Sequence, residues 1–500
     1  MIYLTLHSFV KKKIKILLYF FINNFKFFTF LFINKFFFLD ENKSVSLLYF
    51  YVDILAKNIN SDNFSNRKNK KIFNKIELLF NKSVKRYPDN IRLYEVMCHT
   101  YLYNCKSEMK FLKKIYQQQN KTLKKSNKNF LVIEPGYALL TIGSAFSLDA
   151  WIKSKKLGFT HNKVSKLILP TPKGIKKPTN PTLMKYFSKY LEIKTDITES
   201  NKYLSEINKR LCTHHFYLNV NRKEIIRTHL AAVHIQSAWD KQKRKPLFSL
   251  SKDDLAKGKK ILKKMGFKKN SWFVTTHVRD KNFKGADGYR DSDINSFYEA
   301  FDEIINRGGY VIRMGSDDAR PTDYKNKKFI DYTKSKFRSD FMDVFLCAQA
   351  KFMLGTSSGL SAVSRIFGVP ILLVNYLPTG TIYGRKGDIF IPQNFISRKN
   401  NKRLTFKKTM SEPYSLGMTD GAYHNVLKVK LEKNSSGDIK NATKEMFDHT
   451  IYKKKYSSRD QRLQNEFKKV AFEKKILPGL KKLITCRIGK DFLEKNQQLL

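Results

Sequence analysis

The chain has 500 residues, of which 42% are hydrophobic and 14% aromatic, with five cysteines and a formal net charge of +53 at pH 7. This length exceeds what one compact core holds and predicts two or three domains. The cysteines are odd in number and form no Cys-x-x-Cys pair, which argues against a disulfide scaffold and a structural zinc site. The charge favours anionic partners, whether nucleotide phosphates, anionic lipids or nucleic acid.

Residues 1–58 form an apolar and basic N-terminal segment. Its run from Ile14 to Leu39 is almost all Phe, Ile and Leu, but asparagines and lysines interrupt it. A membrane-spanning helix needs about 20 apolar residues with few charges. Two interpretations stay open: membrane contact, or a helical packing element or extension. We expect a cytoplasmic protein, with peripheral attachment at the cytoplasmic face of the inner membrane as the location that membrane contact would imply.

A helical region is expected next, over residues 73–118. Its apolar residues follow the 3.6-residue period, which the Tyr-Pro-Asp-Asn stretch at 87–90 breaks and restarts. This pattern predicts a single helical hairpin of tetratricopeptide style, packed on the main body because one copy is too few for a solenoid. The polar stretches 59–72 and 119–128 are interpreted as linkers.

From residue 129 to 250 the pattern predicts a first Rossmann-like domain. Strands are expected at 130–133 and 166–170, and helices at 144–157 and 182–193. A further helical stretch is expected over 225–250. The glycine-containing loop between the first strand and helix lacks the GxGxxG spacing, so it carries no dinucleotide fingerprint.

Residues 252–435 predict a second Rossmann-like domain, because strands and helices alternate strictly. The expected strands are 271–278, 310–314, 351–354 and 370–375, and the expected helices are 253–265, 293–306, 339–348 and 360–367. The helical region 436–500 is expected to close back on the first domain. The fold class predicted is therefore α/β and GT-B-like, with two Rossmann-like domains facing a cleft and an N-terminal helical extension.

Three strand ends of the second domain bear groups that bind anions. His277 and Arg279 follow the first strand, Gly315-Ser316-Asp317-Asp318 the second, and Gly355-Thr356-Ser357-Ser358-Gly359 the third. The carboxyl edge of an open α/β sheet is where ligands bind, and an arginine there can clamp a phosphate. The third group runs into a helix, whose first amides can cradle phosphate oxygens. Singly, each motif has a structural alternative: a solvated turn for Asp317-Asp318, or helix cover for Arg365.

Residues from about 240 to 450 resemble a family of bacterial glycosyltransferases and, more distantly, the HxR fucosyltransferases. The segments that carry the resemblance are THVRD (276–280), RDSDINSFYEAFDEIINRGGYVIRMGSDD (290–318), IDYTKS (330–335), DVFLCAQAKFMLGTSSGLSAVSRIFGVP (343–370) and NSSGDIKNATKEMFDH (434–449). The resemblance implies a GT-B fold, inverting transfer and no obligatory metal or cofactor. It places a nucleotide-sugar donor, GDP-linked in the fucosyltransferases, on 252–435, with the acceptor on 129–250.

The resemblance also implies roles for individual residues. His277 and Arg279, the pair Asp317 and Asp318, and Asp343 with Thr356, Ser357 and Ser358 would line the donor site, together with Gly315, Gly359 and Arg365. Asp280 stands where many fucosyltransferases have a second arginine. Asp287 occupies the position of an acid proposed as base in that family, where a glutamate is usual.

The expected chemistry is a single displacement at an anomeric carbon. Arg279 and the amides of Ser357–Gly359 would stabilise the leaving diphosphate, and Asp280 or Asp287 would accept the proton of the acceptor hydroxyl. Both carboxylates could equally be exposed loop residues paired with Lys281 or Lys284.

Other functions stay open at this point. Another GT-B activity, such as a nucleotide-sugar epimerase or a heptosyl-type transferase, uses the same kind of site. A nucleic-acid-binding protein fits the charge, but basic residues are spread over the chain rather than gathered with aromatics in a stripe, so no specific nucleic acid is expected. A membrane-docking scaffold is the third alternative. The partners expected are a nucleotide sugar and a glycan or glycolipid acceptor of the bacterial cell envelope.

Overall fold

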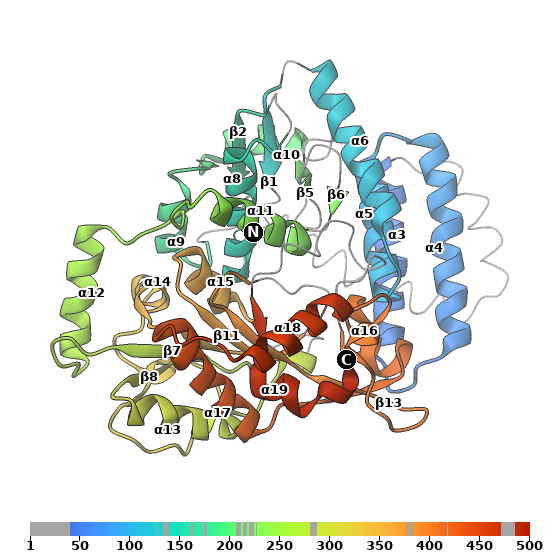
Figure 1. Cartoon of the computed structure of the whole chain (residues 1–500). Helices are drawn as coiled ribbons and strands as arrows, with labels where there is room; N and C mark the ends of the chain where they lie inside the picture. The colour runs from blue at the N-terminus through green and yellow to red at the C-terminus, as the bar shows by residue number, and fades with distance from the viewer. Residues whose placement is uncertain are drawn as a thin grey trace.

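A computed structural model describes the chain from residue 41 to 500, except residues 127, 134–138, 140, 161–163, 172, 175–177, 207–211, 214–217, 220–224, 227, 281–287, 378, 380–383, 418 and 472–485. Three parts are visible in Figure 1: a group of long helices on one side, a small parallel sheet with its helices above, and a larger sheet with its helices below. The expected α/β architecture of two Rossmann-like domains with an N-terminal helical extension is confirmed.

The helical extension consists of four helices, longer than the hairpin expected at 73–118. They are α3 (Glu41–Ile59), α4 (Asn66–Arg86), α5 (Ile91–Tyr103) and α6 (Met109–Lys125). The expected break at 87–90 separates α4 from α5. The linker interpretation is wrong for residues 66–72 and 119–125, which are helical. Their polar residues cover the outer face of a helix, while Ile115, Gln119 and Leu123 of α6 are buried at helical spacing.

Part of the N-terminal segment is a packed helix. Helix α3 packs against α4 and α5, and its Leu48 and Leu55 are fully buried. Residues 41–58 therefore act as a packing element, and the prediction of membrane contact for residues 1–40 lies outside the described part of the chain. Within the described part, none of the helices has the length and apolarity required to cross a bilayer.

The first sheet has four parallel strands in the order β3-β2-β1-β4. Its strands are β1 (Phe130–Ile133), β2 (Lys166–Pro170), β3 (Glu192–Lys194) and β4 (Cys212–Thr213). Its helical elements are η2 (Ile142–Ser144), α8 (Ala145–Lys156), α9 (Pro181–Phe187), α10 (Ile197–Glu206) and α11 (Thr228–Lys241), beside a short β5 (Leu218–Asn219) and β6 (Ile225–Ile226) hairpin.

Two boundaries in this domain differ from expectation. The helix expected at 182–193 ends at Phe187, because residues 192–194 pair with the edge of β2 instead. The stretch 225–250 is helical only in α11, since residues 225–226 belong to the hairpin and 242–251 are turns and loop.

The second sheet has seven parallel strands in the order β15-β12-β11-β10-β7-β8-β9. They are β7 (Phe273–His277), β8 (Tyr310–Arg313), β9 (Phe329–Asp331), β10 (Met353–Gly355), β11 (Ile371–Tyr376), β12 (Ile389–Pro392) and β15 (Arg487–Ile488). The chain winds outward from β7 through β8 to β9, then returns to the other side of β7 at β10. The direction of winding therefore reverses between β7 and β10, the topological switch point where Rossmann-like sheets bind ligands.

Helices cover this sheet on both faces, in places close to those expected. They are α12 (Lys252–Lys264), η4 (Gly288–Arg290), η5 (Ile294–Phe297), α13 (Tyr298–Asn306), η6 (Tyr332–Lys334), α14 (Asp340–Gln349) and α15 (Gly359–Ile366). A hairpin of β13 (Asn394–Ser397) and β14 (Val429–Glu432) projects beside the sheet, with α16 (Phe406–Thr409), η8 (Tyr414–Leu416) and the π-helix η9 (Ala422–Val426) between its strands.

The C-terminal region packs on the second domain. Its described elements are α17 (Ser436–Glu445), η10 (Met446–Ile451), α18 (Ser458–Ala471), β15, α19 (Lys490–Lys495) and η12 (Gln497–Leu499). Strand β15 extends the second sheet beside β12, and α17 packs against α13 and α19. The expectation that 436–500 closes onto the first domain is therefore wrong for the described residues, because β15 pairs with β12 at the edge of the second sheet (Figure 1).

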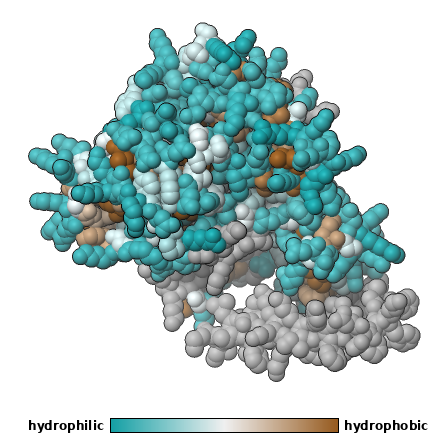
Figure 2. Space-filling view, turned by 90° about the horizontal axis from the view of Figure 1, so that it is seen from below, coloured by the Kyte–Doolittle hydropathy of each residue, from teal (hydrophilic) through white to brown (hydrophobic). Residues whose placement is uncertain are grey.

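The two domains meet where α15 begins. Helix α15 packs against η2 and α8 of the first domain. A Cβ atom on Gly359 would lie 2.5 Å from Ile142 Cγ2 and 2.8 Å from the backbone N of Gly143, so only glycine permits this approach. The start of α15 is thereby held between the two domains. The surface in Figure 2 is mostly hydrophilic, with hydrophobic residues in small separate patches, consistent with the high charge.

Candidate functional site

The site is built at the carboxyl edge of the second sheet. Strands β7 and β10 are neighbours, and His277 at the end of β7 is aligned with Gly355 at the end of β10. A Cβ atom on Gly355 would lie 2.3 Å from the carbonyl oxygen of His277, so a side chain there would separate the two strands. The residues that follow these strands are therefore brought together at the switch point.

Arg279 lies against the serine-rich turn, Gly355-Thr356-Ser357-Ser358-Gly359, rather than in solvent. Its side chain is 5% exposed, and its backbone N–H donates to Thr356 Oγ1 at 3.2 Å. The guanidinium turns toward Asp291, whose Oδ1 lies 3.1 Å from Arg279 Nε. Burial raises the pKa of the Asp291 carboxyl, and the charge of Arg279 opposes that effect.

His277 is enclosed beside this pair. Burial lowers the pKa of its imidazole to about 4, with Arg279 and Arg313 acting in the same direction and Asp280 against it. The ring is therefore neutral at pH 7, and its Nδ1 has no hydrogen-bond partner among the described residues. Gly315, after β8, lies next to it: its Cβ position would be 3.8 Å from His277 Cδ2, and its φ of +150° suits glycine.

Two hydroxyl groups of the serine-rich turn have no hydrogen-bond partner among the described residues. Thr356 is fully buried and Ser357 is 6% exposed, and both precede the first turn of α15. Ser357 Oγ and Ser358 Oγ are buried and lack a hydrogen-bond partner among the described residues. Buried polar atoms are normally paired, so this pair of hydroxyls points to a ligand. A helix N-terminus and a buried arginine lie beside these hydroxyls, and both favour negative charge.

The acidic pair after β8 is more peripheral. The Asp317 side chain is 82% exposed, with an oxygen 3.7 Å from Arg338 Nη1. Asp318 accepts a hydrogen bond from the Ser316 hydroxyl. Asp343 lies in the first turn of α14, beside Tyr332 and Arg338, and burial raises the pKa of its carboxyl.

The remaining expected residues divide into three cases. Asp280 accepts the backbone N–H of Arg320 at 2.9 Å, so it fixes the loop after β8. Asp287 lies outside the described residues. Arg365 is not brought to the edge: it lies in the last turn of α15, about 9 Å along the axis from Gly359, with its guanidinium 5.1 Å from the ring centroid of Phe146 on α8.

Three charged residues of the site escaped sequence reasoning. Asp291 was given no role in the site; it lies just before the helix expected at 293–306, and Asp293 caps the first turn there. Asp420 accepts the backbone N–H of Gly288 at 2.9 Å, across 132 residues of sequence. Lys433 donates to the Tyr289 carbonyl oxygen at 2.8 Å, and burial lowers the pKa of its ammonium group to about 8. The sequence held no signal for Asp420 or Lys433, because neither follows a strand of the large sheet.

Asp420 and Lys433 line a pocket of about 520 Å³ between the helical extension and the second domain. Its wall includes Asn60 and Asp62 at the end of α3, and Asp420, Lys430 and Lys433 around the β13–β14 hairpin. The volume is within the range of small-molecule sites.

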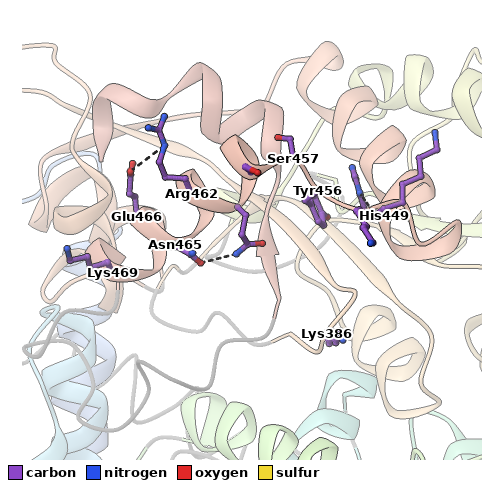
Figure 3. A pocket seen from close by; sticks show the side chains of 12 residues that line it. Lys386, His449, Tyr456, Ser457, Arg462, Asn465, Glu466 and Lys469 are labelled. Atoms are coloured by element: carbon purple, nitrogen blue, oxygen red, sulfur yellow. Dashed lines mark hydrogen bonds and ion pairs between the residues drawn. The ribbon is translucent and has the colours of Figure 1, made fainter.

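A larger, open hollow of about 1050 Å³ lies elsewhere, beside the start of α18 (Figure 3). Lys386, which lines it, precedes β12, so the hollow adjoins the amino edge of the sheet, opposite the site. His449 and Tyr456 stack in its wall with ring centroids 3.7 Å apart. Within the described residues, no group of three or more His, Cys, Asp or Glu side chains is arranged to hold a metal ion.

No protein-family model and no curated protein sequence matches this chain. Among solved structures, it is similar to a glycosyl transferase of family 9 from Veillonella parvula, with 12% identity and a TM-score of 0.34 over 52% of this chain and 84% of that one. It is similar also to E. coli ADP-heptose LPS heptosyltransferase II, with 11% identity and a TM-score of 0.29 over 49% and 84%. A UDP-GlcNAc 2-epimerase from Methanocaldococcus jannaschii follows, with 16% identity and a TM-score of 0.19 over 53% and 66%. Likeness at these TM-scores supports no functional inference.

Proposed function

We propose that this protein is a glycosyltransferase that transfers a sugar from a nucleoside-diphosphate sugar to a hydroxyl of a glycan or glycolipid, with inversion at the anomeric carbon. The observation that supports it most is the hydrogen bond that joins Arg279 N–H to Thr356 Oγ1 at the switch point, because Thr356 directly precedes Ser357 and Ser358, whose buried hydroxyls have no partner among the described residues. A buried cation, two hydroxyls and the first amides of a helix suit the oxygens of a diphosphate.

In this proposal, Arg279 and the start of α15 stabilise the negative charge that builds on the leaving diphosphate. Removing one such donor typically lowers the turnover rate by roughly 10²–10³-fold, which corresponds to an activation barrier higher by about 2.7–4 kcal/mol. Neutral His277 contributes a hydrogen-bonding ring rather than a charge. Because these groups already offset the diphosphate charge, we expect turnover to persist when divalent cations are removed with a chelator.

The nucleoside would extend toward the loops after β8 and the start of α14, where Asp317, Asp318 and Asp343 lie. A GDP-linked donor and a hexosyl or fucosyl group follow from the sequence resemblance and stay predictions. So do Asp280 and Asp287 as proton acceptors; the bond from Arg320 N–H to Asp280 favours a structural role for that carboxylate. A cytoplasmic location with peripheral membrane attachment stays a prediction as well.

The test is a panel of nucleoside diphosphates and their sugars, scored for binding by calorimetry and for hydrolysis. We expect one nucleoside diphosphate to bind to wild type and not to Arg279→Ala, and its sugar to be hydrolysed slowly. A wild-type protein that binds none of them would refute the proposal. A nucleotide-sugar epimerase, the second candidate on the same site, converts its donor without any acceptor, so analysis of the sugar released separates the two.

A further inference from the structure

The pocket that Asp420 lines has a wall made by the end of α3 in the helical extension. The backbone N–H of Gly421 donates to Asn60 Oδ1 at 3.0 Å, and Asn425 Nδ2 donates to the carbonyl oxygen of Ile59 at 2.7 Å. A Cβ atom on Gly421 would lie 2.0 Å from that same oxygen, so the contact requires glycine. The end of α3 is thereby fixed against the segment that carries Asp420.

Asp420 stands between this pocket and the anion-binding edge. A Cβ atom on Gly288 would lie 2.9 Å from Asp420 Oδ2 and 3.4 Å from Asp291 Oδ2, so the two carboxylates flank one point of the chain. Asp291 is in turn paired with Arg279. Asp420 itself remains exposed on the pocket side. A hydroxyl group in the pocket could therefore meet both Asp420 and a sugar whose diphosphate lies at Arg279.

We propose that this pocket, rather than the domain of residues 129–250 that the resemblance implied, holds the acceptor and that Asp420 is the catalytic base. This inference rests on the proposed function. The acceptor oxygen bonds to the anomeric carbon as the bond from that carbon to the diphosphate oxygen breaks. The electron pair of the broken bond leaves with the nucleoside diphosphate, and the acceptor proton passes to the Asp420 carboxylate. The acceptor is a polyhydroxy compound, because the wall offers amide, carboxylate and ammonium groups that bind hydroxyls, beside the tyrosines Tyr289 and Tyr423.

The electrostatic surroundings of Asp420 agree with this role. Partial desolvation by the surrounding chain raises the pKa of its carboxyl, although the side chain keeps an exposed face. The backbone N–H groups of Gly288 and Tyr289 oppose the rise, and so do the charges of Lys433 and Arg279. The negative charge of Asp420 in turn raises the pKa of the nearby Asp291 carboxyl. A raised pKa brings a carboxylate closer to the proton affinity that a general base needs near neutral pH.

The experiment uses the full chain, the donor found by the panel, and concentrated glycerol as a surrogate acceptor beside water. We expect Asp420→Asn to lower the rates of donor hydrolysis and of transfer to glycerol by roughly 10²–10⁴-fold. The dissociation constant of this variant for the nucleoside diphosphate should equal that of wild type. Asp253→Asn, an exposed carboxylate on α12, is the matched control and should keep wild-type rates.

Two further variants keep the proposal falsifiable. With Asp420→Ala, sodium azide should restore turnover and yield a glycosyl azide, because an anionic nucleophile has no proton to lose. Lys430→Trp, which fills the pocket, should lower the ratio of glycerol transfer to hydrolysis. Wild-type rates in Asp420→Asn would overturn this inference, and so would an unchanged ratio of transfer to hydrolysis in Lys430→Trp. The proposed function would still stand if the wild-type protein binds a nucleoside diphosphate. A wild-type protein without donor turnover would remove both.

Discussion

Arg279 and Asp291 form an ion pair, with 3.1 Å between Nε and Oδ1, at the point where the direction of winding reverses in the large sheet. The buried guanidinium of Arg279, next to the serine-rich turn, is thus held by a carboxylate of its own loop. A bound diphosphate must share Arg279 with Asp291 or displace it. The Arg279–Asp291 ion pair therefore fixes the position of the guanidinium and also competes with a ligand for it.

Arg279→Ala should abolish nucleoside-diphosphate binding and lower turnover by at least roughly 10²-fold, because the cation of the site is lost. Calorimetry and a hydrolysis assay measure the two effects. Arg244→Ala is the control, since that exposed arginine lies over Trp239 at the end of α11, away from the sheet edge. Normal turnover in Arg279→Ala would exclude this edge as the donor site.

Asp291→Asn should tighten nucleoside-diphosphate binding, by up to about tenfold or 1.4 kcal/mol, because the competing negative charge is removed while the side-chain shape is kept. The dissociation constant from calorimetry is the measurement. Weaker binding in this variant would show instead that Asp291 is needed to place the guanidinium.

Ser357→Ala and Ser358→Ala should separate a ligand-binding role from a structural one. Neither hydroxyl has a partner among the described residues, so its removal should leave the free energy of unfolding unchanged or slightly higher. Each change should nevertheless weaken diphosphate binding by about 1 kcal/mol. Denaturant unfolding and calorimetry on the same samples test this, and a loss of stability with unchanged binding would contradict it.

Glu445 predicts a pH dependence of stability. It is 1% exposed, accepts hydrogen bonds from Lys490 N at 2.6 Å and Tyr456 Oη at 3.0 Å, and burial raises the pKa of its carboxyl from 4.5 to about 7. Arg487 lowers this pKa and Asp491 raises it. Because the pKa is raised in the folded state, the stabilisation is present below pH 4.5 and is lost as the pH rises through about 7.

The free energy of unfolding of wild type should therefore fall by up to roughly 3 kcal/mol through Glu445 as the pH rises from 4.5 to about 7. Glu445→Gln should lose less, as measured by urea unfolding at pH 5 and pH 8. Glu494→Gln is the control, since that carboxylate is paired with Arg459 on the surface, 2.8 Å away. Equal pH slopes in wild type and Glu445→Gln would rule out this carboxyl as the source.

Much of the architecture followed from local pattern. Strands 130–133 and 166–170 were predicted at the observed bounds, and His277, Gly315 and Gly355 were placed at strand ends. Continuous apolar runs between turn residues are a property of neighbouring residues, so the sequence expresses them directly. The strands β9 and β15 were missed because they have only three and two residues, too few to show an alternating or continuous apolar pattern.

The order of the strands and the partners of the charged groups needed the folded chain. That His277 ends beside Gly355, and that Asp420 meets Gly288 across 132 residues, depends on which loops the crossovers bring together. Local sequence determined that cationic and hydroxyl groups stand at strand ends. Only the tertiary structure decided that Asp291, and not solvent, faces Arg279, because electrostatic pairing depends on distance in space and burial, which residue spacing along the chain does not encode.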